Sequence, residues 1–78
     1  MRYRCEIVIG KGEGEIALVD KILSLTDTEI VLLFPDKSGL RISGAWFRFG
    51  EGGPRIAGQQ RVGSAWKTVS ARILEMVP

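Results

Sequence analysis

The sequence predicts a small, mostly antiparallel all-β domain. Several short segments alternate apolar and polar residues with a period of two, which is typical of half-buried strands. Glycine-rich and proline-containing stretches separate these segments and favour turns. The chain has 78 residues, of which 45% are hydrophobic and 26% charged. This composition is sufficient for a folded core, and the chain is too short to form a second core. We therefore expect a single domain over residues 1–78.

The first predicted strand covers residues 2–9. Its apolar face holds Tyr3, Cys5, Ile7 and Ile9. Cys5 is the only cysteine, so an intrachain disulfide is impossible, and on this face it is expected to act as a small buried hydrophobic residue. The alternate glycines of residues 10–14 then predict a turn, because glycine accepts positive φ angles and offers no side chain for packing.

The next segment, residues 15–25, is ambiguous. Its apolar residues fit one face of a helix or both faces of a strand, and short apolar runs cannot be separated by periodicity alone. We favour a strand, because Thr26–Asp27 fits a tight turn and residues 28–34 are rich in β-branched and apolar side chains. Two strands joined by a few polar residues form a hairpin.

Residues 35–39 form the clearest predicted turn, with Pro35 early and Gly39 late. A strand follows over residues 40–49, where Gly44 predicts a bulge or bend. Alternation within this strand places Trp46 and Arg48 on the same face as Leu40 and Ile42. Phe47 and Phe49 would then share the other face with Arg41.

The C-terminal part contains a predicted loop and a last strand. Residues 50–64 include five glycines and one proline, and their length and polarity indicate a functional or mobile loop. Residues 65–77 alternate as a strand requires, although a helix also fits them. The five strands together predict an SH3-like or OB-like barrel, since closure of a small antiparallel sheet removes its exposed edges. The alternative is an α+β fold with a helix at 15–25 or 65–77.

The residue types that most enzymes need are missing. The chain has no histidine, which removes the commonest general base and metal ligand and every Ser-His-Asp arrangement. The carboxylates are scattered along the chain without the spacing of a catalytic pair. Lys11 is followed by Gly12 and Glu13, which does not match the phosphate-binding P-loop. We therefore expect no enzymatic activity, no cofactor and no metal site.

The charge is distributed unevenly although the net charge is only +2. Residues 1–39 carry five Lys or Arg against seven Asp or Glu, whereas residues 40–78 carry six against two. Five of these six cations are arginines, whose planar guanidinium suits protein interfaces, phosphates and aromatic stacking. Two tryptophans lie in the same half of the chain. The candidate binding residues are Trp46, Arg48, Arg55, Arg61 and Trp66.

Arginine beside tryptophan is typical of two kinds of surface. Protein interfaces use both residues as anchors, and small barrels hold single-stranded nucleic acid by base stacking plus backbone charge. A third interpretation places both tryptophans in the core. The sequence ranks a protein-binding module first, including self-association into a homo-oligomer, with single-stranded nucleic acid as the alternative. No apolar run is long enough for a membrane helix, and we expect a cytoplasmic protein, of the size common among phage and mobile-element accessory proteins.

Overall fold

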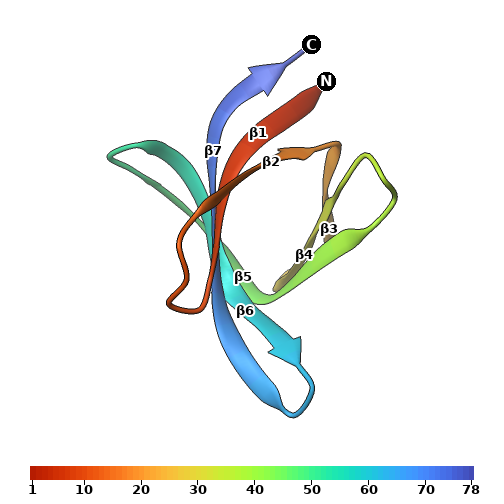
Figure 1. The fold of residues 1–78 in the computed structure, drawn as a ribbon, viewed down its shortest axis with the longest axis vertical. Coiled ribbons are helices and arrows are strands. Elements are labelled where there is room, and N and C mark those ends of the chain that lie inside the picture. The colour runs from red at the N-terminus through yellow and green to blue at the C-terminus, as the bar shows by residue number, and fades with distance from the viewer.

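The computed structural model describes all 78 residues and contains strands only (Figure 1). The prediction of an antiparallel all-β domain is confirmed. The helices considered at 15–25 and 65–77 are absent, and no helix exists that could cross a membrane. The strand count of five is wrong, because there are seven strands: β1 (Arg2–Ile9), β2 (Glu15–Val19), β3 (Lys21–Thr26), β4 (Glu29–Leu33), β5 (Gly39–Gly50), β6 (Gly53–Val62) and β7 (Ala65–Val77).

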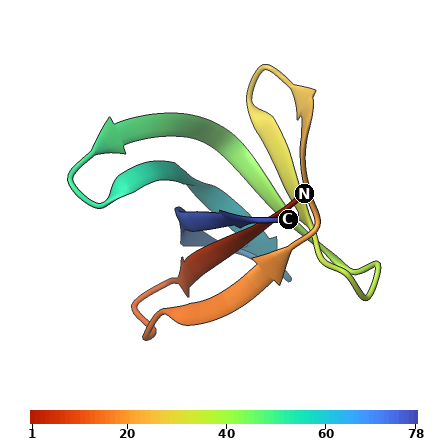
Figure 2. The same ribbon diagram turned by 90° about the horizontal axis from the view of Figure 1, so that it is seen from above.

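The seven strands form one sheet in the order β2-β1-β7-β6-β5-β4-β3, and every neighbouring pair is antiparallel. The sheet curls into a half-barrel (Figure 2). Its two outermost strands, β2 and β3, are consecutive in the chain and are separated only by Asp20. The Asp20 N–H donates a hydrogen bond of 2.7 Å to the Leu33 carbonyl. Asp20 therefore marks a bend in one continuous segment. Before the bend the segment pairs with β1, and after it the segment pairs with β4.

Eleven buried hydrophobic residues form one core cluster on the inner side of the curled sheet: Cys5, Ile7, Val19, Ile30, Leu32, Leu40, Ile42, Ala45, Ile56, Val69 and Ala71. Every strand except β3 contributes to this list. Full burial of one aliphatic side chain contributes about 1.5–3 kcal/mol. Cys5 is completely buried, as its place on the apolar face of β1 predicts, and this burial raises the pKa of its thiol.

Residues 50–64 are not a loop, which corrects the sequence prediction. A tight turn at Gly52 and Gly53, both with φ near +90°, leads directly into the ten-residue strand β6. This strand pairs with β5 on one side and β7 on the other. The strand pattern is weak in the sequence because the inner face of β6 carries only Ile56 as a fully buried side chain, while its next inward position is Gly58.

A bulge in β5 reverses the predicted faces of this strand. Gly44 has a φ of +60°, and the pairing register with β6 shifts between Ser43 and Trp46. One extra residue in a strand interrupts the alternation of its side chains. Leu40 and Ile42 therefore point into the core, whereas Trp46 points away from it. The prediction of a bulge or bend at Gly44 is confirmed. The prediction that Trp46 shares a face with Leu40 and Ile42 is wrong.

Gly58 lies opposite this bulge and leaves no room for a side chain. A Cβ atom at position 58 would lie 2.5 Å from Ile42 Cγ2 and 2.7 Å from the Ser43 carbonyl oxygen. We expect Gly58→Ala to lower the free energy of unfolding by about 1–3 kcal/mol through overpacking. Gly50→Ala is the matched control, since no atom lies within 4 Å of its added Cβ. Urea denaturation followed by tryptophan fluorescence measures both, and equal stability of the two variants would contradict the close contact.

Candidate functional site

The five candidate residues all lie on the side of the sheet that faces away from the core. The pairing register sets Trp46 opposite Ala57, Arg48 opposite Arg55, and Arg61 opposite Trp66. These positions alternate along β6 with the buried Ile56 and the inward-facing Gly58. We call this surface of β5, β6 and β7 the outer face, and it comprises Trp46, Arg48, Arg55, Ala57, Gln59, Arg61, Trp66, Thr68, Ser70 and Arg72.

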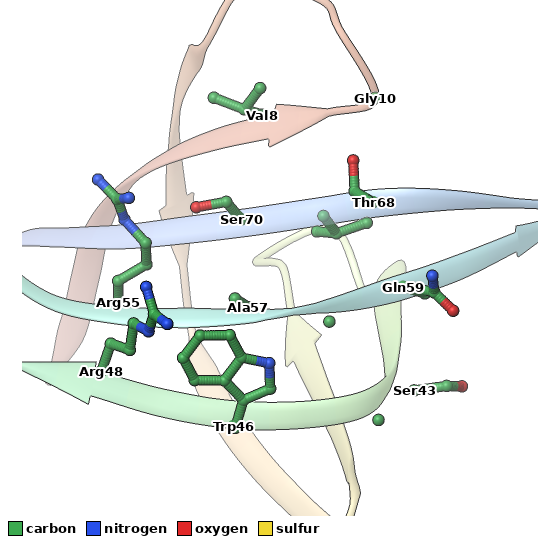
Figure 3. Close-up of a pocket in the computed structure, with 13 residues that line it drawn as sticks. Val8, Gly10, Ser43, Trp46, Arg48, Arg55, Ala57, Gln59, Thr68 and Ser70 are labelled. Atoms are coloured by element: carbon green, nitrogen blue, oxygen red, sulfur yellow. The ribbon is translucent and has the colours of Figure 1, made fainter.

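Part of the outer face is a shallow hollow of about 500 Å³. Trp46, Arg48 and Arg55 line it, and Figure 3 shows both guanidinium groups extending from one end of the hollow beside the Trp46 indole. Its floor is formed by small side chains, among them Ala57 and Ser70. The sequence does not predict this hollow, because small residues form its floor only when three strands place them side by side.

Each tryptophan of the outer face has its own arginine. The Arg48 guanidinium carbon lies 4.2 Å from the Trp46 ring centroid, and that of Arg61 lies 6.0 Å from the Trp66 ring centroid. Trp46 is 44% exposed and Trp66 53% exposed, so neither tryptophan is a core residue. An exposed cation–π contact contributes about 0.5–1 kcal/mol, which orients the guanidinium while leaving much of each ring accessible.

The structure separates these candidates into two groups rather than one cluster. Trp46, Arg48 and Arg55 gather at the hollow. Arg61 and Trp66 lie at the far end of the β6–β7 hairpin, where the Arg61 Nε donates a hydrogen bond of 3.1 Å to the Gly63 carbonyl. The six residue steps from Arg55 to Arg61 correspond to about 20 Å of strand.

Three of the four arginines on the outer face have no carboxylate partner, and Arg72 is the exception. The protein has seven arginines. Four of them form salt bridges with carboxylates: Arg2 with Asp20, Arg4 with Glu75, Arg41 with Glu29, and Arg72 with Glu6. The remaining three are Arg48, Arg55 and Arg61, all of them candidate residues on the outer face. This face therefore presents guanidinium groups without an internal counter-charge.

Three arginines also stand side by side across adjacent strands. Arg48 on β5 is opposite Arg55 on β6, which is in turn opposite Arg72 on β7. Only Arg72 has a carboxylate, at 3.1 Å from Glu6, and its Nε atom is buried without a hydrogen-bond partner. Like charges directly opposite each other destabilise a sheet. The arginine row (Arg48, Arg55 and Arg72) is therefore expected to lower the stability of the protein slightly.

No three or more Cys, Asp or Glu side chains come close enough to form a metal site. No protein-family model, curated protein or solved structure matches the chain. What the outer face binds must therefore be inferred from its geometry and charge.

The arginine row predicts an unusual effect of a single substitution. Arg55→Gln removes the central charge and should raise the free energy of unfolding by about 0.2–1 kcal/mol at low ionic strength. The gain should vanish at about 1 M salt, where the screening length falls to about 3 Å. Arg41→Gln is the control, because it removes a paired arginine and should be neutral or destabilising. Urea denaturation at both salt concentrations tests this, and a destabilised Arg55→Gln variant at low salt would show that the row is not strained.

Proposed function

We propose that this protein is a non-enzymatic binding module and that its outer face binds single-stranded nucleic acid. The observation that carries the proposal is the set of three unpaired arginines beside two exposed tryptophans on one sheet face. Single-stranded nucleic acid offers what this face lacks, namely phosphate charge for the guanidinium groups and flat bases for the indole rings. Base stacking on an aromatic residue contributes about 1–3 kcal/mol per base.

The middle of the outer face favours nucleic acid over a protein partner. Gln59 and Thr68 lie between the two tryptophan–arginine pairs, and both offer hydrogen-bonding groups. The centre of a protein interface is usually its most apolar part, with polar residues at the rim. Here the aromatic residues lie at the ends and the polar residues in the centre. This arrangement supports nucleic acid ahead of a protein partner for this surface, the opposite of the order that the sequence alone favours.

The curled antiparallel sheet supports the same proposal. Small OB-like barrels bind oligonucleotides on an exposed strand face, and we assign the half-barrel to the SH3-like or OB-like class as part of the proposed function. In this assignment β5, β6 and β7 supply the binding strands, while the bent segment formed by β2 and β3 closes the opposite side.

The proposal predicts a strong dependence on salt. A labelled dT12 oligonucleotide should bind with an affinity that falls steeply between 50 and 200 mM salt, because phosphate contacts release counterions. Arg48→Gln should weaken binding and reduce the slope of log K against log salt by about 0.7, the contribution of one phosphate contact to a single strand. Arg41→Gln should leave both unchanged, since that guanidinium is already paired with Glu29. Fluorescence anisotropy measures both quantities, and the absence of binding at low salt would refute the proposal.

A second candidate function, self-association, rests on the opposite face of the same hairpin. Phe47 and Phe49 on β5 are 51% and 81% exposed, and they lie opposite Ile56 and Pro54 on the inner side. The protein exposes 5327 Å² in total, against about 4,700 Å² expected for a monomer of this mass. The excess of about 600 Å² approaches the ~800 Å² that each partner buries in a standard interface. A second copy of the chain would cover this apolar surface.

Self-association through these phenylalanines makes a distinct prediction. Wild-type protein should sediment as a dimer at micromolar concentration, and the dimer should persist at 0.5 M salt because its contact is apolar. Phe49→Ser should shift the equilibrium to monomer. Leu25→Ser, which removes an apolar side chain that is 51% exposed on β3, should leave it unchanged. A strictly monomeric wild-type protein at high concentration would exclude this candidate.

A further inference from the structure

We propose that the outer face engages a nucleic-acid strand at two separate stacking points, Trp46 and Trp66, with the strand bridging the polar surface between them. This inference rests on the proposed nucleic-acid function and adds a minimum ligand length to it. An oligonucleotide too short to span the two tryptophans would occupy only one of them.

The pairing register sets the distance between the two points. Trp46 is opposite Ala57, and Trp66 is opposite Arg61, so the two tryptophans are four residue steps apart along β6. They also lie on the two strands that flank β6. Four steps correspond to about 14 Å, and two strand spacings to about 10 Å. The two stacking points are therefore separated by about 17 Å across the sheet.

Each point contains both groups that a nucleotide needs. Trp46 has the Arg48 guanidinium at 4.2 Å, and Trp66 has that of Arg61 at 6.0 Å. No other aromatic residue lies on the outer face between them, where Gln59 and Thr68 are exposed and polar. A base in the middle can form hydrogen bonds but finds no stacking surface. The outer face thus has a tryptophan–arginine pair at each end and polar side chains between the two pairs.

The separation sets limits on the strand that can bridge it. At the stacked spacing of about 3.4 Å per nucleotide, 17 Å corresponds to about five nucleotides, and to fewer when the backbone is extended. Adjacent bases of a dinucleotide are too close to reach both tryptophans. Once the first base is bound, the second contact is intramolecular, so affinity should rise abruptly at the bridging length rather than in equal steps.

The experiment measures how unlabelled dT2, dT4, dT6, dT8 and dT12 compete with labelled dT12 for wild-type protein and for Trp66→Ala. We expect wild-type affinity to rise sharply between dT2 and dT6. Trp66→Ala should weaken dT8 and dT12 by about 5- to 150-fold, the equivalent of one stacked base, and should change dT2 binding by less than twofold. Trp66→Phe keeps an aromatic surface and should restore most of the loss, which separates stacking from a change in folding.

The possible failures are distinguishable. If dT12 does not bind the wild-type protein at low salt, the proposed function fails and this inference fails with it. If dT12 binds but Trp66→Ala weakens all lengths equally, or none, the two-point arrangement is wrong while nucleic-acid binding stands. If polyglutamate of matched charge competes as well as dT12, the face recognises charge alone, and both the stacking points and the nucleic-acid proposal are overturned.

Discussion

The close contact between Gly58 and the β5 bulge determines how the rest of the molecule is arranged. The missing side chain at position 58 lets the Ser43 carbonyl and the Ala45 backbone lie directly against β6. This contact accommodates the extra residue at Gly44, whose φ of +60° suits glycine. The first half of β5 then directs its aliphatic residues into the core, and the second half directs Trp46 outward. One backbone irregularity thereby separates the part of β5 that fills the core from the part whose Trp46 and Arg48 side chains face outward.

The same shift explains why two different surfaces occupy one hairpin. Beyond the bulge, Trp46 and Arg48 lie on the outer face, and Phe47 and Phe49 lie on the inner side where the core no longer covers them. Charge and apolar area are thus separated by the thickness of a single sheet. A ligand held by guanidinium groups and a partner held by phenylalanines would approach from opposite sides without competing. Figure 1 shows the β5–β6 hairpin, which carries Trp46, Arg48, Phe47 and Phe49, projecting from the rest of the sheet.

The energetics of the outer face differ from those of the remainder of the domain. Elsewhere arginines are neutralised across strands, as in the Arg4–Glu75 pair between β1 and β7. The arginine row instead places Arg55 between two other arginines and supplies one carboxylate, Glu6, at its end. In natural proteins, local conflicts of this kind occur mostly at functional sites. The expected cost of about 0.2–1 kcal/mol is small beside the total stability of about 5–15 kcal/mol that is typical of a folded domain.

The sequence by itself determined the antiparallel β class, the turn at residues 35–39 and the buried Cys5, because alternation and turn chemistry are local properties of the chain. The five candidate binding residues that it also suggested stay a prediction. The existence of β6, the outward direction of Trp46 and the lack of partners for Arg48, Arg55 and Arg61 were decided only by the tertiary structure. In the sequence Gly58 is typical of a loop. Only the folded sheet shows that it contacts a bulge fourteen positions earlier in the chain. Likewise, an arginine is unpaired only in relation to carboxylates on other strands. The register of a sheet is set by contacts between residues that are distant in the sequence, and these contacts exist only in the folded protein.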